Sequence, residues 1–167
     1  WDPTTRVPLM FAGPSISKGA RCGRPAELLD IYPTLADLCE LKSVPEEIEG
    51  LSLVPQLKDA KAPRSRPAMT SHGPGNDSVR TETHRYIRYA DGSEELYDVR
   101  KDPNEYKNLA ADSKTMKLRK KLASHFPKNP AKPVEGSNAR LIERKKDGSV
   151  YWQNTLIKKD AKIPEYE

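Results

Sequence analysis

The sequence has few of the residues that stabilise small secreted proteins or cross membranes. Of its 167 residues, two are cysteine, two are tryptophan and two are phenylalanine, and aromatic residues make up 7% of the chain. No apolar run approaches the roughly 18 residues that span a bilayer, and no charged-then-apolar signal segment opens the chain. We therefore expect no membrane span. Because the first residue is Trp1 rather than methionine, we expect that the start of the gene product is missing or was removed.

The two cysteines limit disulfide and metal chemistry. Cys22 and Cys39 allow one disulfide at most, and their spacing matches no paired zinc-ligand pattern. Cys39 ends an apolar helical stretch, where a small buried side chain is the simpler interpretation. Whether the two cysteines pair, and therefore the redox compartment, stays open.

The positive charge is concentrated in one segment. The chain carries a formal net charge of +5, and residues 113–138 hold seven lysines and arginines but one acidic residue. Such a segment could bind nucleic acid or an acidic polymer. It has no interleaved aromatic residues for base stacking, so a solvated helix face is the favoured interpretation and we expect no nucleic-acid partner.

Hydrophobic periodicity predicts that the N-terminal part of the chain contains a buried strand followed by helices. Residues 7–13 form an almost unbroken apolar run that predicts a strand buried on both faces, of the kind found in sheets covered by helices. Residues 25–39 have helical spacing, with Pro33 expected to interrupt or restart the helix. Ser52 is expected to cap a short helix that ends at Leu57.

The middle of the chain predicts a small antiparallel sheet. Alternating segments and turn residues indicate strands at 68–71, 78–82, 85–89 and 94–98, with Asp91-Gly92 as a hairpin signal. A helix is expected over 113–126, and three prolines in 127–138 indicate a linker. Residues 150–152 could pair as a strand. The combination suits one compact domain with a modest core.

No residue pattern by itself defines an enzyme. The three histidines, His72, His84 and His125, lack the spacing of a catalytic zinc site, and neither a phosphate-binding glycine loop nor a nucleophile elbow is present. His72 is the most interesting of the three, because it lies beside Gly73 in a loop between expected strands.

The order of several short blocks closely resembles the C-terminal part of the type I sulfatases, and most closely the iduronate-2-sulfatase-like branch from bacteria. The blocks are residues 6–11 (RVPLMF), 25–35 (PAELLDIYPTL), 49–53 (EGLSL), 85–89 (RYIRY), 95–98 (ELYD), 102–105 (DPNE) and 108–109 (NL). The resemblance implies an α/β, alkaline-phosphatase-like fold, of which this chain is the C-terminal portion with a small antiparallel sheet and a packed helix. It assigns residues 1–62 to the end of the α/β domain, 63–126 to the C-terminal sheet subdomain, and 127–167 to an extended linker and tail.

The resemblance also implies what the chain lacks. Type I sulfatases use a formylglycine made from Cys/Ser-x-Pro-x-Arg and a calcium ion, with lysine and histidine side chains that bind the sulfate. Neither Cys22 nor Cys39 lies in that motif, and the metal ligands lie upstream of this chain in the family pattern. We therefore expect no catalytic or metal-binding residue here, calcium only in the complete enzyme, and no activity without the missing N-terminal part.

The same resemblance suggests a role at the substrate cleft. The C-terminal subdomain of the family contributes to the rim of the cleft, which makes His72, Asn76 and Arg80 candidates for binding a sulfated carbohydrate. His72 and Asn76 can hydrogen-bond sugar hydroxyls, and Arg80 can pair with a uronate carboxylate. A periplasmic or extracellular location is expected from the resemblance alone.

Two other functions stay open. A phosphoesterase or phosphonate monoester hydrolase shares the fold, and the missing nucleophile motif would separate it from a sulfatase. A stand-alone module that binds anionic glycans through residues 114–121 is the third hypothesis. Against it, a strand at 7–12 without neighbours predicts a chain that is marginally stable or aggregates.

Overall fold

The structure is a computed structural model that describes residues 1–130, 142–152 and 155–158. Its contacts divide the chain into two compact units, Trp1–Pro130 and Ala131–Glu167. In the first unit the helical elements are α1 (Asp2–Thr5), the 3-10 helices η1 (Leu28–Asp30) and η2 (Ser113–Thr115), α2 (Ile31–Leu38), α3 (Val54–Lys58) and α4 (Met116–Ala123), and the strands are β1 (Ala68–Ser71), β2 (Asp77–Arg80), β3 (His84–Arg88) and β4 (Glu94–Asp98). The part of the chain that is described contains no helix long and apolar enough to cross a membrane.

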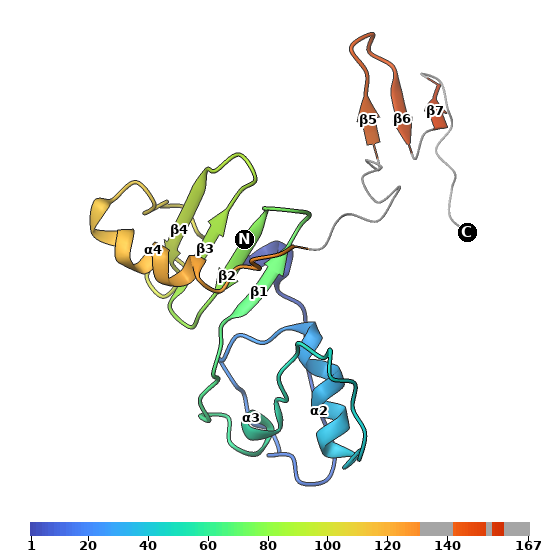
Figure 1. Ribbon diagram of the computed structural model, residues 1–167, viewed down its shortest axis with the longest axis vertical. Coiled ribbons are helices and arrows are strands. Elements are labelled where there is room, and N and C mark those ends of the chain that lie inside the picture. Colours follow the sequence, from blue (N-terminus) through green and yellow to red (C-terminus); the bar gives the residue numbers. More distant parts are fainter. Residues whose placement is uncertain (131–141, 153–154, 159–167) are drawn as a thin grey trace. The chain divides into compact units, whose positions relative to one another are not determined.

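The centre of the first unit is the antiparallel sheet that the sequence predicts. Its strands lie in the order β1-β2-β3-β4, and every neighbouring pair is antiparallel (Figure 1). Val79, Tyr86 and Leu96 are directly opposite one another on adjacent strands and are at most 1% exposed. They pack against Leu122 and Phe126, at the end of α4 and just beyond it. The predicted sheet with a packed helix is therefore confirmed.

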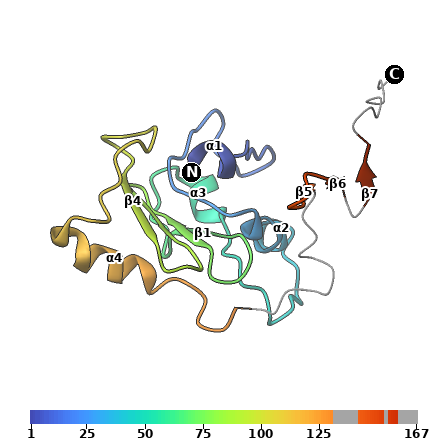
Figure 2. The same cartoon turned by 90° about the horizontal axis from the view of Figure 1, so that it is seen from above.

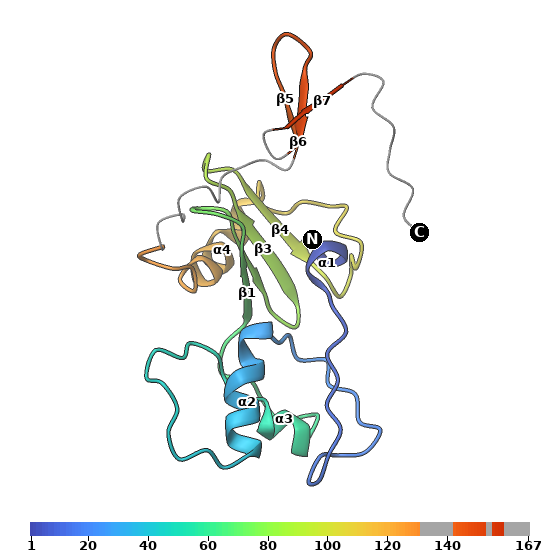
Figure 3. The same cartoon turned by 90° about the vertical axis from the view of Figure 1, so that its right-hand side faces the viewer.

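The two faces of this sheet carry different helices. Figures 2 and 3 show α4 on one side of the sheet and α1, at the N-terminus, on the other. The face under α4 is apolar at its centre, whereas the face under α1 presents Arg85, which is 2% exposed. Side chains alternate between the faces of a strand, so neighbouring residues of β3 serve two different surfaces.

The strand predicted at residues 7–12 is wrong. These residues form no strand, and Val7 and Met10 are 53% and 88% exposed. A strand buried on both faces requires neighbouring strands and covering layers. The strands of the first unit lie at 68–98 and pair with one another, so the described residues offer the 7–12 segment no partner.

The helical segment around Pro33 is confirmed, and its largest apolar side chains are half exposed. Pro33 lies in the first turn of α2, where no amide hydrogen is needed. The buried side chains of α2 are Thr34 and Ala36, whereas Tyr32 and Leu35 are 51% and 48% exposed. The large apolar side chains of α2 are therefore only partly covered within the described residues.

Two smaller expectations are also corrected. The short helix α3 begins at Val54 with Leu53 as its N-cap, and Ser52, one residue earlier, accepts the Val54 amide on its Oγ at 3.3 Å. The Leu53 amide donates to Thr34 Oγ1 at 2.8 Å, and the helix ends at Lys58 rather than Leu57. Cys39, expected to be buried, is exposed, and both cysteines are free. Cys39 lies at the end of α2, beyond the part of the helix that is covered.

The second unit contains a further small sheet. Strands β5 (Ile142–Arg144), β6 (Val150–Trp152) and β7 (Thr155–Ile157) pair antiparallel in that order. The expected strand at 150–152 is confirmed, and the segment predicted as an extended linker and tail includes these three strands.

Candidate functional site

The β1–β2 hairpin brings together two of the three predicted substrate-binding residues. The His72 amide donates to the Asn76 carbonyl at 2.8 Å, and the turn between them contains Gly73 and Gly75 at positive φ. A Cβ on Gly75 would lie 3.3 Å from Ala90 Cα, so glycine allows this close approach. Asn76 Oδ1 accepts the Ala90 amide at 3.1 Å and fixes the loop to the next hairpin, whereas His72 is exposed.

Arg80 lies apart from these two residues. It ends β2 opposite Ala68, whereas the loop begins beyond the opposite end of the same strand pair, at Ser71 and Asp77. Arg80 lies four residues from Asn76, which at about 3.3 Å per residue is a separation of roughly 13 Å along the strand. Arg80 Nε lies 3.2 Å from Asp2 Oδ1, so its charge already has a partner. The structure therefore does not bring Arg80 into one site with His72 and Asn76.

A buried ionic cluster under α1 was not foreseen from the sequence. Arg85 Nε donates to Glu105 Oε1 at 2.5 Å, and both side chains are at most 2% exposed. Arg85 also pairs with Asp2, whose amide donates to Glu105 Oε2 at 3.0 Å. Partial burial raises the pKa of Asp2, but the hydrogen bond and charge of Arg85, followed by Arg80, outweigh it and lower the pKa.

This cluster fastens the first residues of the chain to the sheet. The Trp1 indole donates to Glu95 Oε2 at 3.0 Å, which adds a contact between residues 94 positions apart. Arg85 lies directly before Tyr86 and Ile87 in β3, and all three side chains are buried. This apolar neighbourhood is the sequence signal for an inward-facing charge. Its partners, Asp2 and Glu105, are far away in sequence and carry no signal at all.

A second ionic cluster joins η1 to the segment before β1. Arg64 Nη2 lies 2.6 Å from Asp30 Oδ2, and Arg66 Nη2 lies 3.1 Å from Glu27 Oε2. Asp30 is fully buried and also accepts the Leu51 amide at 2.8 Å. Asp30 and Glu27 therefore hold η1 against the segment before β1 and are not open to a ligand.

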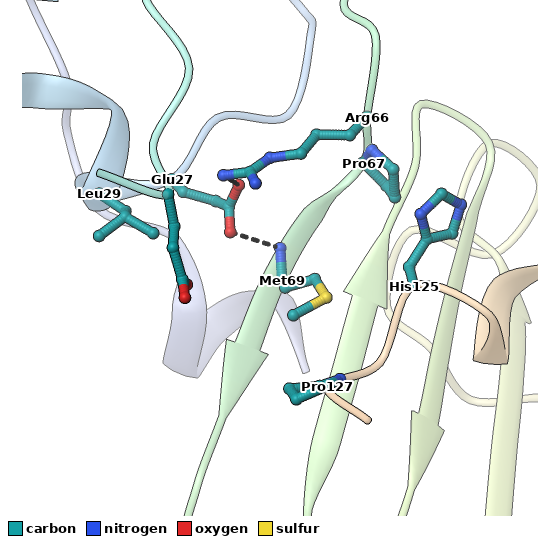
Figure 4. Close-up of a pocket in the computed structure, with 8 residues that line it drawn as sticks. Glu27, Leu29, Arg66, Pro67, Met69, His125 and Pro127 are labelled. Atoms are coloured by element: carbon teal, nitrogen blue, oxygen red, sulfur yellow. Dashed lines mark hydrogen bonds and ion pairs between the residues drawn. The ribbon is translucent and has the colours of Figure 1, made fainter. Parts of the chain in front are cut away.

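Beside this cluster is a hollow of about 390 Å³. Its lining residues are Glu27, Leu29, Glu49, Arg66, Pro67, Met69, His125 and Pro127. Figure 4 shows the Arg66 guanidinium beside Glu27, whose carboxylate also accepts the Met69 amide at 3.2 Å. The Arg66 guanidinium is thus paired with Glu27 by charge, although its Nε and Nη2 atoms are buried without a hydrogen-bond partner among the described residues. The residues that line the hollow contain no nucleophile with an adjacent base.

The described residues do not fit a calcium site. They contain no group of three or more histidine, cysteine or acidic side chains that could hold a metal ion. Two pairs of carboxylates share an arginine, Glu27 with Asp30 at Arg64 and Asp2 with Glu105 at Arg85, and are neutralised by it rather than open to a cation. Calcium prefers six to eight oxygen ligands, so it would need carboxylates other than these.

Comparison with known proteins identifies the chain. The family model described as "N-sulphoglucosamine sulphohydrolase, C-terminal" matches residues 1–132, which include α1, the sheet and α4. The chain belongs to the C-terminal region of the sulfatase family. The resemblance inferred from the sequence blocks is thereby confirmed.

Individual sulfatases support this assignment. The chain is 36% identical over 154 residues to a sulfatase of Formosa agariphila and 39% identical over 141 residues to the Delta 4,5-hexuronate-2-O-sulfatase of Bacteroides thetaiotaomicron. These alignments cover 90% and 75% of this chain but 30% and 28% of the two sulfatases. The solved structure of a 2-O GAG sulfatase matches 69% of this chain and 27% of its own, with 34% identity and a TM-score of 0.54.

Proposed function

We propose that this chain is the C-terminal part of a sulfatase that hydrolyses sulfate esters of an acidic polysaccharide, with a 2-O-sulfated uronate as the first substrate to test. The observation that carries the proposal is the family match over residues 1–132, joined to 39% identity with a hexuronate 2-O-sulfatase. The complete protein then has the α/β, alkaline-phosphatase-like fold. The nucleophile and the calcium ligands belong to the part of that protein outside residues 1–167, and the chain alone is inactive.

The exposed apolar side chains of the first unit support this view. Met10 is 88% exposed, and on η1 and α2 Leu28, Tyr32 and Leu35 are exposed by about half. Leu28, Tyr32 and Leu35 are spaced as i, i+4 and i+7, so they share one side of the helical segment. We assign this surface to packing against the rest of the sulfatase domain, because the chain spans about 30% of the relatives it matches.

This packing can be tested by charge insertion. Leu35→Glu should make the isolated chain less prone to aggregate, because it removes an exposed apolar group, and should destabilise the complete protein, where the same position is covered. Tyr106→Glu, at a side chain that is 86% exposed, is the matched control. If Leu35→Glu and Tyr106→Glu affect the complete protein equally, the surface does not pack against the rest of the domain.

The hairpin loop supplies the proposed sugar contact. His72 is exposed on a loop that Asn76 fastens to the neighbouring hairpin, so the imidazole is presented from a braced turn. We assign to His72 a hydrogen bond to a sugar hydroxyl. Arg80 is left out of this contact, because it is paired with Asp2. His72→Ala should raise KM for a disaccharide and leave KM for a small aryl sulfate unchanged, and an equal effect on both substrates would contradict the assignment.

The activity is tested on the polypeptide that carries residues 1–167 in full. Ion chromatography measures the sulfate released from a 2-O-sulfated uronate disaccharide and from a 6-O-sulfated glucosamine disaccharide. It also measures the phosphate released from a phosphate monoester of similar size. Sulfate release from the uronate substrate, abolished by a calcium chelator and restored by calcium, is the expected result. Release of phosphate without release of sulfate would favour the phosphoesterase alternative and overturn the proposal.

Location is a separate part of the proposal. An enzyme that acts on a large acidic polysaccharide must meet its substrate where the polymer is present, which favours a periplasmic or extracellular protein. Fractionation of the source cells, with the polypeptide detected by antibody, tests this. Recovery in the cytoplasmic fraction alone would contradict it.

A further inference from the structure

A small basic hollow lies between α4 and the sheet. Its volume is about 190 Å³. Its lining residues are Tyr86, Arg88 and Glu94 from the sheet and Met116, Arg119, Lys120 and Ala123 from α4. The four helix residues are spaced as i, i+3, i+4 and i+7, so they form one face of α4. Three cationic side chains and one carboxylate therefore surround the hollow.

The carboxylate is already occupied. Glu94 Oε1 accepts the Tyr86 hydroxyl at 2.5 Å, and Glu94 Oε2 pairs with Arg119 Nη1. Asp77 also lies near Arg88, with its Oδ2 at 3.9 Å from Arg88 Nη2, and its Oδ1 accepts the Ser71 hydroxyl at 2.6 Å. Arg88 and Lys120 thus keep much of their positive charge available to a ligand.

The position of Arg88 is fixed by aromatic rings. Its guanidinium carbon lies 4.6 Å from the centre of the Phe126 ring, and Phe126 stacks on Tyr86 with the ring centres 5.5 Å apart. Stacking on an aromatic face leaves the edge of a guanidinium free for hydrogen bonds. Arg88 is 39% exposed in its side chain, so this edge is accessible.

Helix α4 extends the positive charge beyond the hollow. It contains Lys117, Arg119, Lys120 and Lys121 and no acidic residue. Lys117 is a helical neighbour of both Lys120 and Lys121, and like charges at these spacings destabilise a helix. The helix therefore carries repulsion that an anionic ligand would relieve.

We propose that this hollow and the adjoining lysines bind sulfate or carboxylate groups of an acidic polysaccharide chain, with Arg88 and Lys120 as the principal contacts. The choice of polymer rests on the proposed sulfatase function. Nucleic acid is disfavoured because the nearby rings, Tyr86 and Phe126, are 1% and 5% exposed and present no face on which a base could stack.

The test is fluorescence anisotropy with a labelled heparin dodecasaccharide, at several salt concentrations, on the full polypeptide. Lys120→Glu should weaken binding about tenfold and reduce the slope of log Kd against log salt by about one, as loss of a single ionic contact does with other polyanions. Arg88→Gln should weaken binding in the same direction. Lys61→Glu makes the same charge change at an exposed lysine after α3 and should leave Kd within about twofold.

Each comparison has an outcome that overturns the site. An equal loss of affinity in Lys120→Glu and Lys61→Glu would mean that net charge alone binds the polymer. Binding of single-stranded DNA more tightly than heparin at equal chain length would reject a polysaccharide site. A desulfated heparin of equal length separates the two anions: retained binding assigns the contact to carboxylates, and lost binding assigns it to sulfates.

The outcome is independent of catalysis. Failure to release sulfate, with polymer binding that still depends on Lys120, would reject the proposed function and keep the anion site. Sulfate release together with polymer binding that does not change in the Lys120 and Arg88 variants would support the proposed function and reject the anion site. Hydrogen exchange of the β3 and β4 amides shows whether Arg88→Gln has unfolded the sheet, and in that case Lys120→Glu decides alone, because Lys120 is exposed.

Discussion

The buried pair of Arg85 and Glu105 makes the sharpest prediction about stability. Arg85→Met keeps the length and apolar stem of the side chain but removes its charge. Glu105, whose side chain is 1% exposed, would then retain only the Asp2 amide as a donor among the contacts described here. Desolvated charge without a counter-charge is costly, so the sheet should be weakened far more than by the loss of a surface ion pair.

The size of the effect follows from the burial. Breaking a buried ion pair by removing one partner costs about 3–5 kcal/mol, whereas a surface pair is worth about 0–1 kcal/mol. Arg100→Met is the matched control, because Arg100 is 62% exposed and lies 3.8 Å from Asp98. At about 1.4 kcal/mol per factor of ten, Arg85→Met should raise the equilibrium constant for opening of the sheet by about a hundredfold or more.

Amide hydrogen exchange of the β3 and β4 segments measures this opening directly, in the full polypeptide and under native conditions. Arg100→Met should change the exchange rates less than about fivefold. Arg85→Met combined with Glu105→Gln should recover part of the loss, because no charge is then stranded. Equal exchange in Arg85→Met and Arg100→Met would refute the reasoning, since it would mean that Glu105 is not effectively desolvated.

Three further predictions concern packing and pH. Gly50→Ala should destabilise the first unit by about 1–3 kcal/mol, because a Cβ at this position would lie 2.1 Å from the Leu29 carbonyl oxygen; exchange of the α2 amides measures it. Leu96→Ala, at a side chain with no exposure, should cost about 2–5 kcal/mol, read from the β4 amides. The hydrogen bond from the Tyr86 hydroxyl lowers the pKa of Glu94, and the ion pair with Arg119 adds to this against the effect of burial. The stability that Glu94 provides should therefore be present above its ordinary pKa of 4.5 and be lost as pH falls through the lower folded value, which acid unfolding followed by circular dichroism tests.

Each of these has a matched control. Gly23→Ala introduces a Cβ with nothing within 4 Å and should be silent, so equal effects at Gly23 and Gly50 would contradict the steric argument. Leu41→Ala, at a side chain that is 53% exposed, should cost much less than Leu96→Ala. Glu94→Gln should remove part of the acid dependence, and an unchanged acid-unfolding profile would show that Glu94 is not responsible.

Local signals in the sequence were sufficient to predict the antiparallel sheet and the family to which the chain belongs. The strands of 68–98 alternate apolar and polar residues and are separated by turn residues, so the hairpins follow from short-range chemistry. Pro33 likewise fixes its own place in the first turn of α2. The order of the sulfatase blocks is a property of the sequence alone, and the family match over 1–132 confirms it.

The candidate sites depended on contacts that no local pattern encodes. His72 and Asn76 lie close together because one hairpin turn joins them. Arg80 instead pairs with Asp2, which is 78 residues away in the sequence. The prediction of a strand at 7–12 was wrong because it also depended on distant contacts. Its apolar residues are typical of a buried strand, but burial on two faces needs neighbouring strands, and the described residues place none there.

The sequence by itself determined the strands and turns of residues 68–98 and the family to which the chain belongs, because periodicity and turn chemistry act over a few residues. Only the tertiary structure decided which charges are paired and which remain available. The carboxylate of Glu94 is taken by Tyr86 and Arg119, and Arg88 is held on Phe126 with its edge exposed. Charge pairing depends on distances of a few ångströms between residues far apart in sequence, and these distances exist only after the chain has folded.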